Sequence, residues 1–235
     1  MRATLVDHKE VAERTSAFTF EVQGSRLEFS AGQTCDLTLT DPSGTGEDEI
    51  HTFSIASPPF EPLLTFATRL TGSAFKRALM ALPLGSAIEI EGPFGSFTLH
   101  DEVERPTIFL AGGVGVTPFR SMLLTAFSQK RLAPLTLVCS NRNARGTPFL
   151  REIEQWASDV PNFRLVATLT APESSEAWTH EVGRVDAGFL KLHLTDRDAI
   201  HYISGPSSFV AAAQAALGSI GVAARDIRTE VFTGY

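Results

Sequence analysis

The spacing of apolar residues changes part-way along the chain, near residue 100. Up to about Leu99, apolar and polar residues alternate over short stretches such as Phe18–Val22, a pattern typical of half-buried β-strands. Clusters of Gly, Pro and Asp separate further stretches of this kind, at Thr34–Thr40, Ile50–Ala56, Leu63–Leu70 and Ala87–Glu91. Many short strands with turn signals between them indicate an antiparallel barrel or sandwich.

From Pro106 onward, apolar segments alternate with stretches of helical periodicity. The expected strands are Thr107–Ala111, Leu135–Cys139, Arg164–Leu169, Ala199–Ser204 and Ile227–Phe232. The expected helices cover residues 117–129, 148–159, 186–194 and 206–217. This alternation indicates parallel strands with helical crossovers, a fold that binds ligands at the carboxyl ends of its strands. The polar segment His100–Arg105 is the expected joint, so we expect one domain over residues 1–103 and another over 104–235.

Composition narrows the classes of function. The chain has 235 residues, 43% of them hydrophobic and 20% charged, which is ample material for a soluble fold with a core. No apolar run reaches the roughly 18–20 residues that span a bilayer. The first twenty residues lack the apolar stretch of a secretory signal, so we expect a cytoplasmic protein. The formal charge of −7 argues against nucleic acid and anionic membranes as partners.

The chain contains only two cysteines, Cys35 and Cys139. Two thiols are too few to hold an iron–sulfur cluster within this chain, and no metal site is expected. A single disulfide is one alternative, and reduced thiols in the cytoplasm are the favoured one.

A glycine-rich turn lies between the first strand and the first helix of the second half. It reads Gly112-Gly113-Val114-Gly115-Val116-Thr117-Pro118, with Thr117 as the expected N-cap and Pro118 as the first helical residue. A helix start of this kind binds phosphate, because its N–H groups are unpaired and glycines permit close approach. The spacing lacks the last glycine of G-x-G-x-x-G, and a tight structural turn is the alternative.

Six motifs occur in a particular order along the two halves. They are HTFSIASP at 51–58, GSAFK at 72–76, GPFGSF at 92–97, the glycine-rich turn, SGP at 204–206 and EVFTGY at 230–235. This order resembles the ferredoxin–NADP reductase superfamily, and the resemblance covers nearly the whole chain. It implies a two-domain protein, with an N-terminal antiparallel β-barrel of Greek-key type that binds FAD. A C-terminal Rossmann-like parallel α/β domain would bind a nicotinamide nucleotide.

The first motif matches the family's R-x-[YF]-S signature. The resemblance implies that Phe53 packs on the isoalloxazine ring and that the Ser54 hydroxyl lies near flavin N5, with Thr52 beside them. His51 replaces the signature's arginine, which pairs with the flavin diphosphate. A neutral imidazole donates one hydrogen bond and lacks a permanent bidentate charge. A plain core strand is the alternative.

The second motif resembles the family's other diphosphate contact, formed by Gly72, Ser73 and Ala74. Ser73 is expected to cap a helix over 75–82 whose first N–H groups receive phosphate oxygens, and Lys76 adds a compensating charge. Ordinary helix capping is the alternative. Because this loop is retained, we favour FAD over FMN. The third motif, at 92–97, is explained as well by a structural turn.

The resemblance assigns the dinucleotide pyrophosphate to the glycine-rich turn, through Gly112, Gly113, Gly115, Thr117 and Pro118. Ser204, Gly205 and Pro206 form a second anion-binding turn after an apolar strand. Ser204 stands where many family members carry Cys, next to the path from nicotinamide C4 to flavin N5. A simple hydroxyl at a strand end is the alternative for this residue.

The stretch about 20 residues past the glycines bears on the choice of nucleotide. An NAD site would favour a carboxylate there for the ribose 2′-OH. The chain instead has Ser140, Arg142 and Arg145, and hydroxyl and guanidinium groups suit a 2′-phosphate. We therefore favour NADP over NAD, with solvated loop arginines as the alternative.

The C-terminal motif supplies Glu230, Phe232 and Tyr235. In the family a glutamate and an aromatic residue at this end lie by the flavin, so Glu230 is a candidate proton carrier or polar wall. Phe232 or Tyr235 would take the aromatic role. An uninvolved terminus is the alternative.

These features together predict an NAD(P)H-dependent, FAD-binding oxidoreductase. Hydride would pass from NAD(P)H to flavin N5, and electrons would pass on to a separate acceptor, either a protein or a small molecule. The candidate catalytic residues are Ser54, Ser204 and Glu230. Two alternatives are kept open by His51: a non-catalytic flavin- or nucleotide-binding subunit of a larger electron-transfer complex, and a free-flavin reductase.

Overall fold

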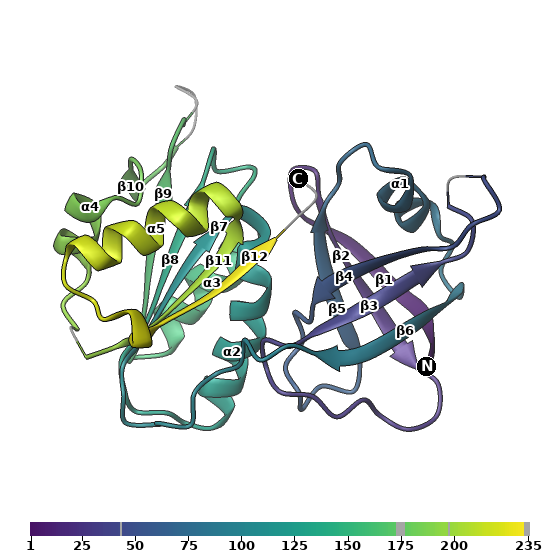
Figure 1. Cartoon of the computed structure of the whole chain (residues 1–235), viewed down its shortest axis with the longest axis horizontal. Helices are drawn as coiled ribbons and strands as arrows, with labels where there is room; N and C mark the ends of the chain where they lie inside the picture. Colours follow the sequence, from purple (N-terminus) through teal and green to yellow (C-terminus); the bar gives the residue numbers. More distant parts are fainter. Residues whose placement is uncertain (43, 173–176, 197, 233–235) are drawn as a thin grey trace. The chain divides into compact units, whose positions relative to one another are not determined.

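The computed structural model describes residues 1–42, 44–172, 177–196 and 198–232 (Figure 1). The fold contains two six-stranded sheets, each the centre of one compact unit. One unit contains Met1–Leu99 and Thr117–Thr125; the other contains His100–Val116 and the chain from Ala126 onward. No helix of the described residues is long and apolar enough to cross a membrane.

The first sheet is antiparallel throughout, with strand order β4-β3-β6-β1-β2-β5. Its strands are β1 (Arg2–Ala12), β2 (Thr15–Val22), β3 (Thr34–Leu39), β4 (Glu49–Ser54), β5 (Leu64–Arg69) and β6 (Ala87–Phe94). An antiparallel bridge between Ile55 and Phe66 brings the chain after β4 against β5, at the other edge of the sheet. The sheet therefore curls into the expected antiparallel barrel.

The barrel core follows from the period-two pattern of its strands. In β3, for example, Cys35, Leu37 and Leu39 are buried while the residues between them are partly exposed. Helix α1 (Ala74–Ala81) adds Phe75 and Leu79 to the same core. Burying a side chain of this size contributes roughly 1.5–3 kcal/mol, so this packing holds the short helix on the barrel.

The second sheet is parallel, with strand order β10-β9-β8-β7-β11-β12. Its strands are β7 (Thr107–Gly112), β8 (Leu135–Asn141), β9 (Phe163–Leu169), β10 (Glu181–Val182), β11 (Ile200–Pro206) and β12 (Ile227–Phe232). Every residue of β7 and β8 is buried, which is typical of central strands covered on both faces. The predicted Rossmann-like sheet is confirmed.

The crossovers of this sheet run in two directions. Its helical elements are η1 (Gly113–Gly115), α2 (Val116–Ser128), α3 (Leu150–Asp159), α4 (Ala187–His193), α5 (Ser207–Ser219) and η2 (Ala224–Asp226). From β7 the chain moves outward through β8 and β9, then returns to β11 on the other side of β7. Right-handed crossovers therefore place α3 on one face and α4 and α5 on the other, and Figure 1 shows α5 across the near face. The strand order reverses between β7 and β11, where nucleotides bind in folds of this class.

The start of α2 differs from the prediction. Thr117 is not the N-cap, because the 3₁₀ turn η1 leads directly into a helix that already begins at Val116. The Val116 N–H donates to the carbonyls of Gly113 and Val114. Thr117 and Pro118 thus lie inside the first turn, where a proline is tolerated because the first N–H groups of a helix have no partner within it.

The cysteines and the third motif are packing features. Cys35 and Cys139 are both buried and unbridged, and burial raises the pKa of each thiol to about 12. Gly92 and Phe94 continue strand β6 rather than forming a turn. A Cβ at Gly92 would lie 2.7 Å from the Cys35 Sγ atom, so close packing requires glycine there.

Candidate functional site

Strand β4 and the first turn of α1 meet through three aromatic rings. The centroid of the His51 imidazole lies 4.2 Å from that of Phe75 and 6.4 Å from that of Phe53. The Phe53 and Phe75 rings stack with centroids 5.8 Å apart. Two of the expected flavin motifs therefore lie side by side at one place on the barrel, although they are separated in the sequence.

His51 has a carboxylate as its neighbour. Its Nε2 atom lies 3.7 Å from Glu49 Oε2, and 42% of its side chain is exposed. Thr52 faces the other side of the strand, because side chains alternate, and its hydroxyl donates to Asp36 on β3. The structure therefore groups His51 with Phe53 and separates Thr52 from them. Ser54, at the end of β4, is buried.

The loop before α1 has the form of an anion cradle. The Lys76 backbone N–H donates to the Ser73 hydroxyl at 3.3 Å, which confirms Ser73 as the N-cap. A Cβ added at Gly72 would meet open space, so the backbone is accessible there. Ala74 is the first residue of the helix. Burial, and then the charge of Arg69, lowers the pKa of Lys76.

In the second unit, the turn after β7 packs tightly against the end of β11. A Cβ at Gly115 would lie 2.2 Å from the carbonyl oxygen of Ser204, and one at Gly205 would lie 2.8 Å from the carbonyl oxygen of Gly112. A Cβ at Gly112 would strike the ring of Phe209 at 2.7 Å. Gly115 and Gly205 are therefore needed for close backbone approach, and Gly112 for the packing of the Phe209 ring.

Gly113 is different from the other glycines of this turn. Its φ is +57°, and a Cβ built there would have no heavy atom within 4 Å. The backbone at Gly113 therefore faces open space at the carboxyl end of β7, beside the point where the strand order reverses. A ligand phosphate would meet glycine backbone at this position.

Ser204 and Glu230 are brought together by strand register. Ser204 on β11 pairs with Ala111 on β7 and with Glu230 on β12. Paired residues of neighbouring parallel strands project on the same face of a sheet. Ser204 is fully buried, and its Oγ atom has no hydrogen-bond partner among the described residues. A buried hydroxyl of this kind needs an explanation, such as a ligand or water that completes its bonding.

The segment after β8 carries the two arginines. Ser140 is buried near the end of the strand, whereas Arg142 and Arg145 are exposed on the loop that follows. The loop is held by the Arg142 carbonyl, which accepts from the Ala171 N–H, and by the Asn143 carboxamide, which accepts from the Gly146 N–H. Its exposed guanidinium groups are therefore carried on an ordered backbone.

Sequence reasoning missed one polar connection in the first unit. The Ser121 hydroxyl donates to the Ser57 carbonyl at 2.7 Å, and an Arg120 N–H donates to the Ala56 carbonyl at 2.9 Å. These bonds hold the chain directly after the Phe53–Ser54 motif. The adjacent polar residues Arg120 and Ser121, between apolar Phe119 and Met122, were the available signal.

Phe232, half-buried, is the last described residue and pairs in register with Pro206. Tyr235 lies outside the described residues.

Residues 109–215 match the family model described as "Oxidoreductase NAD-binding domain". The chain is also 31% identical over 212 residues to the reductase component 1 of terephthalate 1,2-dioxygenase from Comamonas sp, with 89% of this chain and 61% of that protein covered. These matches support the ferredoxin–NADP reductase superfamily as the family of this chain, as expected from the motifs. The matching family model is that of an oxidoreductase domain.

Solved structures of this superfamily share the fold along nearly the whole chain. The flavohem-like FAD/NAD-binding domain of nitric oxide dioxygenase from Vibrio cholerae has a TM-score of 0.89 at 20% identity, with 98% of both chains covered. A ferredoxin–NADP⁺ reductase from Neisseria gonorrhoeae with bound FAD and NADP has a TM-score of 0.83 at 19% identity, also with 98% of both covered. At these identities the likeness establishes the fold.

Proposed function

We propose that this chain is an NAD(P)H-dependent flavin reductase that passes electrons to a separate acceptor. FAD would bind to a barrel domain, residues 1–103, and the nicotinamide nucleotide to residues 104–235. The observation that carries the proposal is the contrast among the glycines. Gly72 and Gly113 have open space where a Cβ would stand, at the two turns expected to hold phosphates, whereas Gly112, Gly115 and Gly205 are packed against protein.

The barrel residues fit a flavin dinucleotide. Phe53, stacked on the buried ring of Phe75, offers partly exposed apolar ring surface beside β4, and Ser54 offers a hydroxyl at the end of the strand. The capped start of α1, with Gly72 before it, suits a diphosphate, and Lys76 adds positive charge. Retention of this second phosphate cradle supports FAD rather than FMN.

The second unit fits a nicotinamide nucleotide. Gly113 would receive the pyrophosphate at the carboxyl end of β7. Ser204 offers a buried hydroxyl at the end of β11, and Glu230 stands beside it in register. We assign these two residues the roles of orienting the nicotinamide and of carrying a proton. When bound, FAD would accept hydride from the nicotinamide and release electrons to the acceptor.

The acceptor would be a separate protein. The relatives support this, since their names describe a dioxygenase reductase component in Comamonas sp and an electron transfer component of toluate 1,2-dioxygenase in Pseudomonas putida. The chain covers 61% and 67% of the lengths of these two proteins.

Exposed Arg142 and Arg145 support NADP as the nucleotide, because a guanidinium pairs well with a 2′-phosphate.

One observation favours a second candidate function, that of a free-flavin reductase. His51 lacks the permanent charge of the family arginine, and Glu49 lies 3.7 Å from its imidazole. A carboxylate next to the diphosphate position would weaken flavin retention, and a weakly held flavin acts as a substrate.

Reconstitution tests the proposal and separates the two candidates. The protein is stripped of flavin, and its affinities for FAD and FMN are measured by quenching of flavin fluorescence. We expect FAD to bind more tightly than FMN and to stay bound through gel filtration. FAD that binds but is lost in gel filtration would favour the free-flavin reductase, and no binding of either flavin would contradict both candidates.

A further inference from the structure

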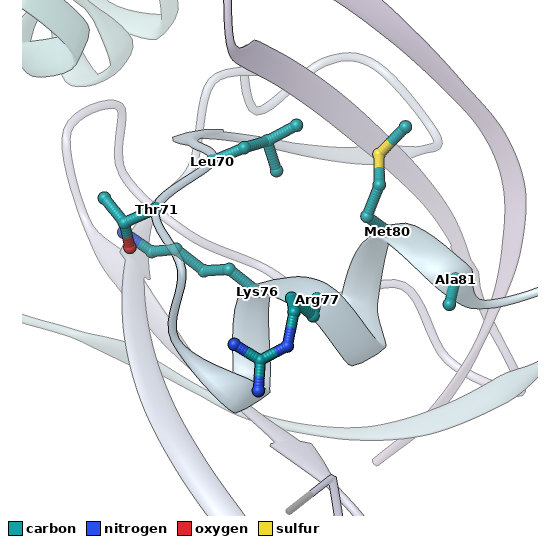
Figure 2. A pocket seen from close by; sticks show the side chains of 6 residues that line it. All are labelled: Leu70, Thr71, Lys76, Arg77, Met80 and Ala81. Carbon is teal, nitrogen blue, oxygen red and sulfur yellow. The ribbon is translucent and has the colours of Figure 1, made fainter.

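A cavity of about 280 Å³ lies between helix α1 and the chain that leaves β5 (Figure 2). Its lining residues come from two short segments: Leu70 and Thr71 from that chain, and Lys76, Arg77, Met80 and Ala81 from α1. The residues that α1 places in the barrel core, Phe75 and Leu79, are different ones. The cavity therefore uses a face of α1 that does not pack into the core.

Part of the cavity lining is apolar and held in place. Leu70, Met80 and Ala81 supply the apolar atoms, and Figure 2 shows Leu70 and Met80 on the side of the cavity opposite the charged groups. The Leu70 N–H donates a hydrogen bond to the Arg14 carbonyl at 2.7 Å. The Ser16 hydroxyl donates to the Met80 sulfur atom at 3.9 Å. Since ligand pockets usually span about 300–1,000 Å³, a cavity of this size fits a small molecule.

The remaining lining is basic. Lys76 extends from α1 toward Thr71, and the Arg77 guanidinium lies beside the start of the helix (Figure 2). The Arg77 guanidinium donates one hydrogen bond to the Gly72 carbonyl. This bond uses one of the five N–H donors of a guanidinium. Arg69 adds a third positive charge that acts on Lys76. None of the six lining residues is acidic, so an anion is the favoured occupant.

We propose that this cavity binds a small carboxylate with an apolar body, about the size of benzoate. The carboxylate would accept hydrogen bonds from the Arg77 guanidinium, with the positive charge of Lys76 nearby, and the apolar body would lie on Leu70, Met80 and Ala81. Basic groups and an apolar wall on one small cavity suit this ligand class better than a bare inorganic anion or a neutral hydrocarbon. The proposal goes beyond the flavin reductase function and does not depend on it.

The methionines give a direct readout. The chain has three, and only Met80 lines the cavity, while Met122 is fully buried elsewhere. We would label the methionine methyl groups of the full chain with ¹³C and titrate with benzoate, acetate and benzyl alcohol. Benzoate should shift the Met80 signal and leave Met122 in place. Its affinity should exceed that of acetate and of benzyl alcohol by at least tenfold, as expected when the charge and the apolar body both contribute.

Two variants and a control make the test specific. Arg77→Gln removes a charge and Ala81→Leu fills the cavity, and each should weaken benzoate at least tenfold. Lys9→Gln removes a positive charge from exposed Lys9 on β1 and should have no effect. An unchanged Met122 signal shows that a variant is folded. Equal weakening in Lys9→Gln, or no weakening in either cavity variant, would overturn the proposal.

In the last part of the experiment, the benzoate titration is repeated in the presence of FAD. We expect benzoate to shift Met80 equally in the flavin-free and the FAD-saturated protein. Loss of the shift on adding FAD would assign the cavity to the flavin site and overturn the proposal of a carboxylate site. Failure of the protein to bind FAD at all would contradict the proposed reductase function and leave the benzoate titration as an independent result.

Discussion

The imidazole of His51 lies against the ring of Phe75, with centroids 4.2 Å apart. This contact joins the strand that carries the proposed flavin signature to the helix that carries the proposed phosphate cradle. In the proposed flavin site, it also places an imidazole where the family signature has an arginine. The strength of flavin binding should therefore depend on this position.

Replacing His51 with arginine should tighten FAD binding about tenfold, because a charge-assisted hydrogen bond contributes about 1.5–3 kcal/mol and Glu49 offsets part of it. The measurement is the dissociation constant for FAD from fluorescence quenching. His51→Gln, which keeps a donor without the charge, is the control and should show no gain. An unchanged or weaker affinity in His51→Arg would mean that the diphosphate does not reach this strand.

A side chain at Gly113 should leave the fold intact but weaken the binding of NADPH. Asparagine is among the residues that adopt a positive φ most readily, so Gly113→Asn should fold and retain FAD. Its side chain would occupy the open space assigned to the pyrophosphate, and NADPH affinity should fall at least tenfold, or about 1.4 kcal/mol. Gly221→Asn, at another open position of positive φ, is the matched control. Equal NADPH affinity in both variants would mean that the glycine-rich turn does not bind the pyrophosphate.

The arginines after β8 should discriminate between the two nicotinamide nucleotides. Arg142→Ala or Arg145→Ala should weaken NADPH roughly ten- to a hundredfold, the equivalent of a charge-assisted pair with the 2′-phosphate. NADH has no phosphate there and should be unaffected. Arg151→Ala, on α3, is the control for loss of a nearby charge. Parallel losses for both nucleotides would remove the basis for choosing NADP.

Two buried histidines should make the protein sensitive to mild acid. Burial lowers the pKa of both His100 and His201 to about 4, from an ordinary value of 6.5. Above pH 6.5 both are neutral in the folded and unfolded chain, and neither affects stability. Between pH 6.5 and 4 only the unfolded chain takes up these protons, so stability falls by as much as about 3 kcal/mol per histidine.

Urea unfolding at several pH values measures this loss. His201→Leu should reduce the slope of unfolding free energy against pH in this window, because one of the two groups is gone. A slope equal to that of the unmodified protein would show that His201 is protonated in the folded state as readily as in the unfolded one.

Much of the architecture could be predicted because local pattern and global fold agree. Strand β12 occupies the expected residues Ile227–Phe232, and Ser73 caps α1 as expected, since both depend on nearby residues alone. Strand β1 was not distinguished, because most of its second half is exposed or partly exposed and lacks a clear alternation. Two-residue strand β10 is too short to leave a pattern.

The parts of the site that could not be predicted depend on residues far apart in the sequence. Thr117 has the chemistry of an N-cap, but the 3₁₀ turn before it, with Gly115 packed against the backbone of Ser204, starts the helix at Val116, two residues before Pro118. The spacing of the glycines likewise does not show that Gly115 is packed against protein atoms whereas Gly113 faces open space. The register that pairs Ser204 with Glu230 follows from strand order, which a single sequence does not specify.

The central claim is that a nicotinamide nucleotide reduces a flavin held by this chain. The most direct measurement is the visible spectrum of the FAD-loaded protein, recorded anaerobically before and after addition of NADPH and, separately, NADH. We predict that the oxidised flavin band is bleached, faster with NADPH, and returns when an electron acceptor is added. A flavin that stays bound and oxidised in the presence of both nucleotides would contradict the account.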